Sequence, residues 1–294
     1  MNVRRIGRRL IRWWTLLRLA GLALLALAFL IGALGYLNEL GWLYLAETPR
    51  RIIAEFYANV SVELASIAIT ILVVDALYQR RETEREKKRL ILQMGSPDNA
   101  FALEAVRALR MHGWLCDGSL RRTDLRKANL QEASLWGANL QEAGLGGANL
   151  QEAGLGGANL QGTYLWDANL QGANLLGADL QRADMREANL QGAYLWGANL
   201  QGAILWGANL REATLEGASL QRADLSGANL QRANLWDADL QEADLSDASL
   251  QGAFLLDADL QEADLREAKY NMATRWSEGF TPPPEAVKVD TERE

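Results

Sequence analysis

The stretch ANLQGANLLGADLQRADMREANLQGAYLWGANL, residues 168–200, repeats every five residues, and the same period continues well beyond it on both sides. From residue 120 to residue 265, every fifth position, 30 in all, is leucine except for Met185. Two residues before these positions, from 123 to 263, alanine occupies 27 of 29 sites. A five-residue step turns an α-helix by about 500°, and in a strand an odd step reverses the face. Neither element can bury this pattern on one side.

A solenoid buries the pattern if the chain turns a corner after every five residues and points each leucine and alanine inward. Asn, Asp and Gly suit the corners. The motif resembles that of the pentapeptide-repeat family, A-[D/N]-L-x-x, which is met at "ANLQG", "ADLQE" and "ANLQE" within residues 116–270. The resemblance implies an all-β, right-handed quadrilateral β-helix with four pentads per coil. At about 4.8 Å per coil, such a rod is about 36 Å long.

Segments at both ends of the repeats are predicted to close the rod. Residues 96–115 indicate a short helix with Ser96 as N-cap, Pro97 as first helical residue and Gly113 as stop. Its apolar side is expected to cover the repeats and consists of Ala102, Ala105, Val106 and Leu109. The segment 271–294 begins with part of a sequence similar to the family's terminating cap, in which Trp276 and Phe280 are expected to cover the last leucines. Residues 281–294 are predicted to be a disordered tail.

The amino-terminal region is typical of a membrane anchor. After the arginine-rich residues 1–18, Leu19–Leu37 has nineteen residues without a charge, close to the roughly 20 needed to cross a bilayer. A second candidate, 56–78, is interrupted by Glu63 and Asp75, and an acid at mid-membrane costs about 2.5–3.5 kcal/mol. Its insertion therefore depends on a partner helix. We predict an α-helical transmembrane hairpin over 19–78, continued by a charged helical stalk over 79–95.

A polar stripe marks the second span, since Asn59, Glu63, Ser66 and Thr70 are spaced to share one helical side. We expect this stripe to face small residues of the first span, namely Ala28, Gly32 and Gly35. Glu63 has two interpretations, an ion or proton site or a hydrogen-bonding contact between helices. The second is favoured because no other acid lies on the stripe.

Basic residues predict the topology of the anchor. Five arginines closely precede the first span, six Lys or Arg occur within 80–89, and only Arg50 and Arg51 lie between the spans. Basic residues concentrate on the cytoplasmic side. Both termini and the repeats are therefore expected in the cytoplasm, with the hairpin in the inner or plasma membrane.

Residues twenty apart should stack on one side of the rod, so its surface forms columns. Asn129 and the asparagines at 149, 169, 189, 209 and 229 form one column, expected to satisfy its own amides from rung to rung. A second, here the Leu135 column, surrounds the leucines from 135 to 255. Its large outward residues are Trp136, Leu176, Tyr194, Trp196, Trp236, Phe254 and Leu256. The opposite one, here the Leu165 column, includes Tyr164, Trp166, Ile204 and Trp206.

Outward files of large apolar groups are typical of an interface, although they can instead cover backbone at corners. We favour the interface, with self-association, a second protein or the bilayer surface as the occupant. The twin phrase at 141–160, QEAGLGGANL printed twice, interrupts both columns and is expected to leave a bare ring of glycine backbone. Its glycines follow the five-residue period, unlike a phosphate-binding loop.

Composition argues against catalysis. One cysteine, Cys116, and one histidine, His112, make a disulfide, a Cys/His metal site or a Ser-His-Asp triad hard to assemble. The carboxylates in the repeats are expected at exposed positions without a pocket to shift their pKa values. We therefore predict no enzyme activity, no cofactor and no small-molecule substrate.

Three functions remain. The first is a membrane-anchored, non-enzymatic scaffold that presents a rigid rod for protein contact. The second follows from the resemblance, because family members imitate DNA and bind type II topoisomerases; ten acids lie within 237–267, but the middle of the rod is nearly uncharged. A nucleic-acid partner is not favoured. The third is a small membrane transport or sensing component.

Overall fold

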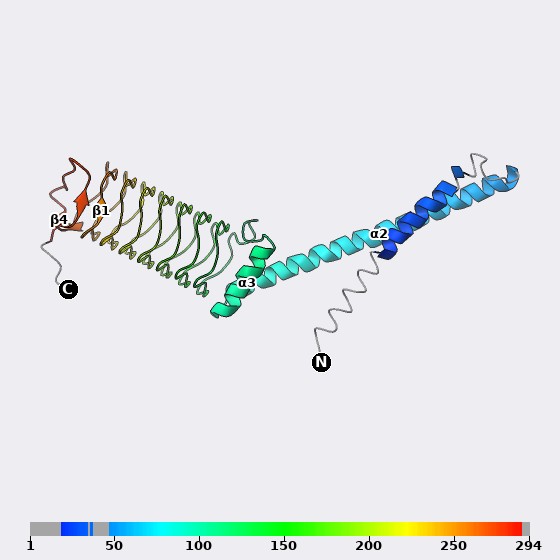
Figure 1. Ribbon diagram of the computed structural model, residues 1–294, viewed down its shortest axis with the longest axis horizontal. Coiled ribbons are helices and arrows are strands. Elements are labelled where there is room, and N and C mark those ends of the chain that lie inside the picture. The colour runs from blue at the N-terminus through cyan, green and yellow to red at the C-terminus, as the bar shows by residue number, and fades with distance from the viewer. Residues whose placement is uncertain (1–18, 35, 38–46, 290–294) are drawn as a thin grey trace. The chain divides into compact units, whose positions relative to one another are not determined.

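A computed structural model describes residues 19–34, 36–37 and 47–289, and the chain forms two compact units, Met1–Glu86 and Lys87–Glu294 (Figure 1). The first unit holds the helix Leu19–Leu34 and most of α2 (Glu47–Met94). The second unit holds α3 (Asn99–Met111), β1 (Phe254–Leu255), β2 (Lys269–Tyr270), β3 (Arg275–Trp276) and β4 (Val287–Lys288).

The two helices of the first unit pack antiparallel through small residues. A Cβ placed on Gly21 would lie 3.3 Å from Leu72 Cδ2, and one on Gly32 would lie 3.5 Å from Ser61 Oγ. Ala28 and Ala68 are buried along the same contact. The glycines therefore let side chains of α2 pack directly against the first helix.

The predicted position of the polar stripe is wrong. Its four members, Asn59, Glu63, Ser66 and Thr70, are all exposed, and the side of α2 that meets the first helix contains Ser61 and Ala68 instead. The physical reason is the rotation of α2, since at about 100° per residue the four stripe positions lie roughly 140–200° around the helix from Ser61. The hydroxyl of Thr70 donates within its own helix to the Ser66 carbonyl at 2.9 Å. Gly35 lies outside the described residues.

The described part of the chain supports one of the two predicted spans. The stretch Ala58–Met94, which includes most of the second candidate, is long and apolar enough to cross a membrane. In the first candidate, Leu19–Leu34 and residues 36–37 are helical, and residue 35 lies outside the described residues, so the length of this span stays a prediction. α2 begins at Glu47, before the predicted start at residue 56, and continues without a break through the predicted stalk. Within the stalk, Arg85 pairs with Glu82 at 2.8 Å.

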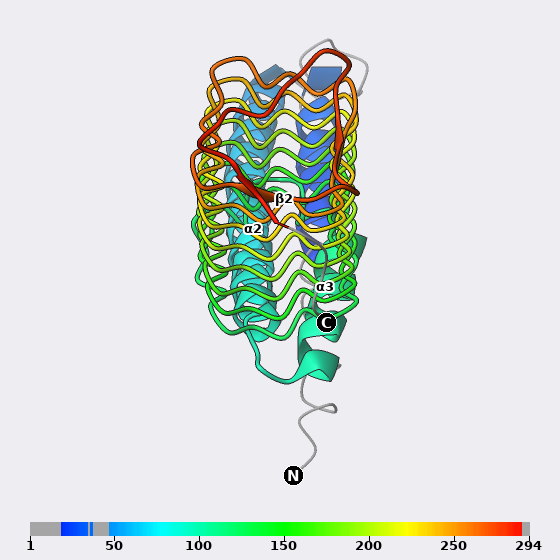
Figure 2. The same cartoon turned by 90° about the vertical axis from the view of Figure 1, so that its left-hand side faces the viewer.

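The repeats form a solenoid with twenty residues per coil. The residue before each leucine makes a parallel bridge with the residue twenty positions later, from Asp124↔Gly144 to Ser249↔Lys269. Four pentads therefore complete one coil, and each side contributes a single bridging residue rather than a long strand. Figure 2 shows the coils stacked one on another. The pentapeptide period thus gives the expected repeat β-helix, whose right-handedness stays a prediction.

Each corner is a tight turn with one residue in the left-handed region. The second residue after each inward position, from 122 to 267, has a positive φ at all 30 corners, of which 17 carry a residue other than glycine. Glu187 is an example, with φ of 56°. The amide of Ala188 closes the same turn by donating to the Met185 carbonyl at 3.1 Å. A positive φ in this place is typical of a type II turn.

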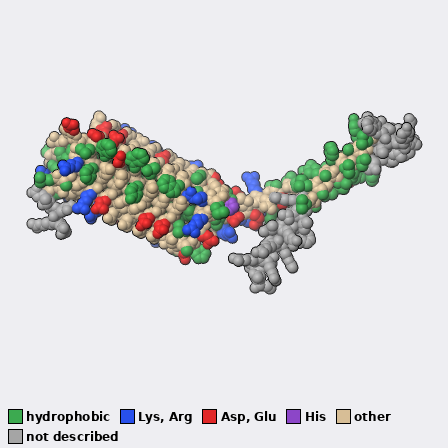
Figure 3. Space-filling view, in the orientation of Figure 1, with side chains coloured by type: hydrophobic (Ala, Val, Ile, Leu, Met, Phe, Trp, Pro, Cys, Tyr) green, Lys and Arg blue, Asp and Glu red, His purple; other side chains and the backbone are tan. Residues whose placement is uncertain are grey.

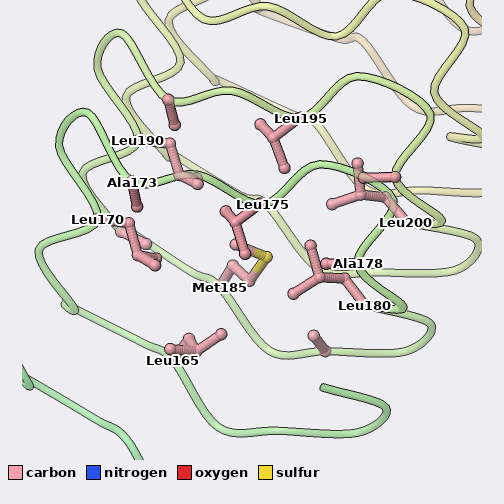
Figure 4. Close-up of a cluster of buried hydrophobic side chains, with 14 of the residues drawn as sticks. Leu165, Leu170, Ala173, Leu175, Ala178, Leu180, Met185, Leu190, Leu195 and Leu200 are labelled. Atoms are coloured by element: carbon pink, nitrogen blue, oxygen red, sulfur yellow. The ribbon is translucent and has the colours of Figure 1, made fainter. Parts of the chain in front are cut away.

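The core is a continuous stack of leucine and alanine. Leu190 and Met185 are fully buried, and Figure 4 shows such side chains pointing into the interior of the coils. Thr163, at an alanine site, is also buried, and its hydroxyl donates to the Leu160 carbonyl at 2.6 Å. Methionine and threonine therefore fit the repeat without disturbing it.

The amino-terminal end of the rod is closed by α3 and its flanking segments. The N-cap is Asp98 rather than the predicted Ser96, because the Asp98 carboxylate accepts from the Phe101 amide at 3.3 Å. The predicted apolar side is confirmed, and its four residues are buried. The Asn129 amide donates to the Ser96 carbonyl at 2.9 Å, so the segment before α3 also pairs with the exposed edge of the first coils.

The carboxyl-terminal end is closed by two parallel pairs, β1 with β3 and β2 with β4. Trp276 stacks on Phe280 at 5.2 Å between ring centroids, and both pack against the core as predicted. The expected disorder of the tail is wrong for residues 281–289, because β4 pairs with β2 and the Val287 amide donates to the Ala268 carbonyl at 2.8 Å. Residues 290–294 lie outside the described part.

Candidate interaction surface

The Leu135 column lies on one side of the rod and is exposed along its length. The inward leucine turns its two neighbours outward, so these positions face solvent. All seven predicted residues are exposed, from 40% for Leu176 to 56% for Tyr194. Figure 3 shows hydrophobic side chains recurring along the visible side of the rod, with charged groups between them.

The glycine coil supports tryptophan rings and is not bare. A Cβ placed on Gly156 would lie 1.9 Å from Trp136 Cζ3, and one on Gly154 would lie 2.5 Å from Trp136 Nε1. The Trp136 ring therefore lies against the backbone of the next coil, and Gly156 is buried beneath it. On the opposite side, a Cβ on Gly146 would lie 2.4 Å from Trp166 Cε2. The expectation of open glycine backbone is wrong at Gly146 and Gly156, because each is covered by an indole.

A polar coil divides the Leu135 column into two apolar segments. Thr214 and Glu216 stand where other coils carry large apolar groups, and the Glu216 carboxylate accepts from Asn234 Nδ2 at 3.3 Å. One apolar segment therefore extends from Trp136 to Trp196 and the other from Trp236 to Leu256. The Trp236 indole donates to an Asp257 carboxylate oxygen at 2.9 Å, which orients its ring.

The asparagine column forms the expected ladder from Asn129 to Asn209. The Asn149 amide group donates to Asn129 Oδ1 at 3.2 Å, and the same bond recurs between successive coils as far as Asn209, which donates to Asn189 at 3.0 Å. Each oxygen also accepts from a backbone amide, as Asn189 does from Gln191 at 3.3 Å. These amides satisfy one another and give the column a structural role.

The Leu165 column combines aromatic rings with ion pairs. Arg186 binds the Asp184 carboxylate through two bonds of 2.8 and 2.7 Å, and the hydrogen bond from Arg186 holds the pKa of Asp184 below its usual value. The same arrangement between Arg126 and Asp124 lowers the pKa of Asp124 to about 2. A hollow of about 220 Å³ lies on this column, lined by Trp166, Asp167, Arg186, Glu187 and Trp206.

Two further hollows occur elsewhere. One of about 700 Å³ adjoins Phe254 at the carboxyl-terminal cap and is lined by Arg232, Gly252, Asn271, Met272, Ala273 and Arg275. The other, about 580 Å³, lies along the small-residue side of the two amino-terminal helices, beside Gly32 and Ser61. Among the described residues, no three His, Cys, Asp or Glu side chains gather as metal ligands. His112 stacks on Trp114 at 4.2 Å, so its ring packs at the end of α3.

Comparison with known proteins identifies the repeat. The family model described as "Pentapeptide repeats" matches eight copies, over residues 119–157, 148–186, 188–227 and 228–267. No curated protein matches the chain.

Solved structures of repeat proteins are also similar. One is HetL, a pentapeptide repeat protein involved in heterocyst differentiation regulation from the cyanobacterium Nostoc, with 28% identity, 56% of this chain and 95% of HetL covered, and a TM-score of 0.31. A pentapeptide repeat protein from the thylakoid lumen of Arabidopsis thaliana is 33% identical, and the match covers 35% of this chain and 72% of that protein with a TM-score of 0.34. QnrB1, a plasmid-mediated fluoroquinolone resistance protein, is 18% identical, and the match covers 57% of this chain and 88% of QnrB1 with a TM-score of 0.33.

Proposed function

Because this chain belongs to the pentapeptide-repeat family, we propose that it is a membrane-anchored, non-enzymatic scaffold whose rod binds a protein partner on the cytoplasmic side. The observation that carries the proposal is the Leu135 column, where seven large apolar side chains are exposed on one side of a rigid solenoid. Such a file is unfavourable in water and favourable when a partner covers it. Trp and Tyr are also the residues that most often contribute strongly to protein interfaces.

The amino-terminal helices support the anchor. Large apolar side chains cover their outer sides, among them Phe29, Val62 and Ile69, all of them exposed. In a bilayer these side chains contact lipid, whereas the backbone bonds are satisfied within the helices. The basic residues before Leu19 and within 80–89 favour a cytoplasmic position for both ends.

The single cysteine gives a direct test of this topology. Cys116 is exposed, and a membrane-impermeant maleimide should label it only after cells are permeabilised. As a matched control, Cys116→Ser combined with Thr48→Cys moves the thiol to the first turn of α2, between the two predicted spans. That variant should be labelled in intact cells. Labelling of Cys116 in intact cells would contradict the cytoplasmic rod.

The contact surface is tested by changing one column at a time. Replacing Trp136, Trp196 and Trp236 by Ser removes large rings from the Leu135 column without touching the core. In cross-linking recovery from native membranes, wild-type protein should retain its partners, or cross-linked copies of itself, and the triple variant should lose them. A matched variant with Trp166 and Trp206 replaced by Ser should retain the partners that the triple variant loses. Unchanged recovery by the first variant would reject this surface.

A second candidate function is imitation of DNA, favoured by the ten acids of residues 237–267. Part of this charge is paired, since Arg222 binds Glu242 at 2.9 Å and Arg266 binds Asp264. Surface pairs of this kind reduce the local field, which weakens the candidate. Full-length protein in detergent should leave DNA supercoiling by gyrase unchanged under the scaffold proposal. Inhibition that is lost when Asp237, Asp247 and Asp257 become Asn would favour DNA imitation.

A further inference from the structure

The hollow of the Leu165 column lies between two tryptophans. Trp166 and Trp206 occupy the same corner position two coils apart, which is about 10 Å along the rod at the spacing of paired strands. The coil between them carries Arg186 at that position. Because Asp184 binds the Arg186 guanidinium through two hydrogen bonds, that side chain is held along its own coil. A space of about 220 Å³ remains beside it.

Gly146 leaves room for the Trp166 ring to lie against the preceding coil instead of filling this space. The ring lies against Gly146, where a Cβ would come within 2.4 Å of Cε2. Gly146 has no positive φ, so alanine there would be strained only by contact with the ring. Any side chain at this position would displace Trp166 from its seat on the preceding coil. The size of the hollow therefore depends on a residue that does not line it.

The charge of the hollow is negative. Its carboxylates are Asp167 and Glu187, corner residues with φ of 55° and 56°, and Arg186 is already neutralised by Asp184. The same side of the rod continues with Asp224 and Asp244. The Asp224 carboxylate accepts from the Ser226 amide at 3.0 Å, and a neutral donor leaves its charge in place. The faces of the two indole rings and the nearby carboxylates all attract a cation.

We propose that this hollow binds the side-chain cation of a lysine or arginine from an extended, basic segment of another protein. The cation lies against Trp166 and Trp206, and the carboxylates of Asp167 and Glu187 supply the opposite charge. In the extended polyproline II conformation, three residues complete one turn and rise about 9 Å, so a side chain three positions on returns to the same face at close to the distance of two coils. A second basic residue three positions along the segment therefore reaches Asp224. A helix needs about seven residues for that distance, so its spacing differs.

This inference goes beyond the proposed scaffold function, because it concerns the opposite side of the rod and needs no membrane. It is tested with full-length protein in detergent and a fluorescent Gly/Ser peptide that has two lysines three residues apart. Fluorescence anisotropy should show binding that weakens with salt. A peptide of equal charge with adjacent lysines should bind about fivefold more weakly, and Trp206→Ala and Glu187→Gln should each weaken binding by about fivefold. Absence of binding, or equal binding of the two peptides, overturns the proposal.

A glycine pair supplies a matched control. Gly146→Ala should push Trp166 into the hollow and abolish peptide binding. Gly156→Ala makes the same change beneath Trp136 on the Leu135 column and should leave binding intact. Equal effects of the two variants would overturn the proposal. Loss of binding in the variant with Trp136, Trp196 and Trp236 replaced by Ser would assign the peptide to the other column, so failure of this inference is distinguishable from failure of the scaffold.

Discussion

Gly156→Ala is expected to destabilise the protein through Trp136. The added Cβ would lie 1.9 Å from Cζ3, so the ring has to move by about 1.5 Å to reach ordinary contact. Trp136 is 45% exposed, which leaves about half of its side chain, roughly 130 Å², in contact with the rod. At about 25 cal/mol per Å², complete displacement would cost about 3 kcal/mol, an upper limit. Partial displacement lowers the free energy of unfolding by about 1–3 kcal/mol.

The decisive measurement is a double-mutant cycle with Trp136→Ala. Once the ring is absent, Gly156→Ala should stabilise the protein by about 0.4–1 kcal/mol, because alanine restricts the unfolded chain and Gly156 has no positive φ. The sign of the effect should therefore reverse between the two backgrounds. Denaturant unfolding of the full chain in detergent, followed by circular dichroism, measures each free energy, with an unchanged m-value as control. An equal loss of stability in both backgrounds would refute the assigned contact between Trp136 and Gly156.

Three further predictions concern the core, an ion pair and a corner. Leu190→Ala should lower the free energy of unfolding by about 2–5 kcal/mol, whereas Thr163→Ala, which restores the commonest residue at that site, should change it by less than about 1 kcal/mol; denaturant unfolding compares them. Arg126→Ala should raise the pKa of Asp124 from about 2 toward 3.8, measured by NMR titration. Because the folded-state pKa is lowered, the stabilising effect of this pair is present above pH 4 and lost as the pH falls toward 2. Glu132→Gly should stabilise the rod by about 0.5–1 kcal/mol in thermal unfolding. Glycine removes the strain of the positive φ of 58° at this corner, and that gain exceeds the loss from the greater conformational entropy of glycine in the unfolded chain.

Much of the fold was predictable because the five-residue period admits few ways of burying leucine. The inward positions, the twenty-residue coil and the apolar side of α3 all follow from that period. The N-cap was predicted wrongly as Ser96, since Ser96 and Asp98 are both good capping residues. Asp98 caps the helix because the Ser96 carbonyl accepts from Asn129 and the Ser96 hydroxyl oxygen accepts from the Asp98 amide at 3.1 Å. A tertiary contact therefore decides between two local signals.

The tail and the glycine coil show two different limits of sequence interpretation. The strand signal in residues 281–289 is short, the alternation Val-Lys-Val at 287–289, and three prolines precede it. The order there comes from the edge that Ala268 and Tyr270 leave open to Val287 and Val289. The contacts between the tryptophan rings and the glycines of the neighbouring coil could have been predicted from the sequence. Gly156 lies twenty residues after Trp136, and positions twenty apart stack. The signal is a large ring on one coil with glycine at the same position on the next.

The twenty-residue coil also limits how this surface can change by insertion or deletion. Removal of five residues keeps every leucine inward but turns all later side chains by a quarter of a circle, so Trp206 would leave the side that carries Asp184. Duplication of ten residues turns them by half a circle. The twin phrase at 141–160 contains such a ten-residue unit twice, which puts Gly146 and Gly156 on opposite sides. One duplication can therefore supply both glycines against which Trp166 and Trp136 pack. Only insertions of twenty residues lengthen the rod while every later residue stays on its own side.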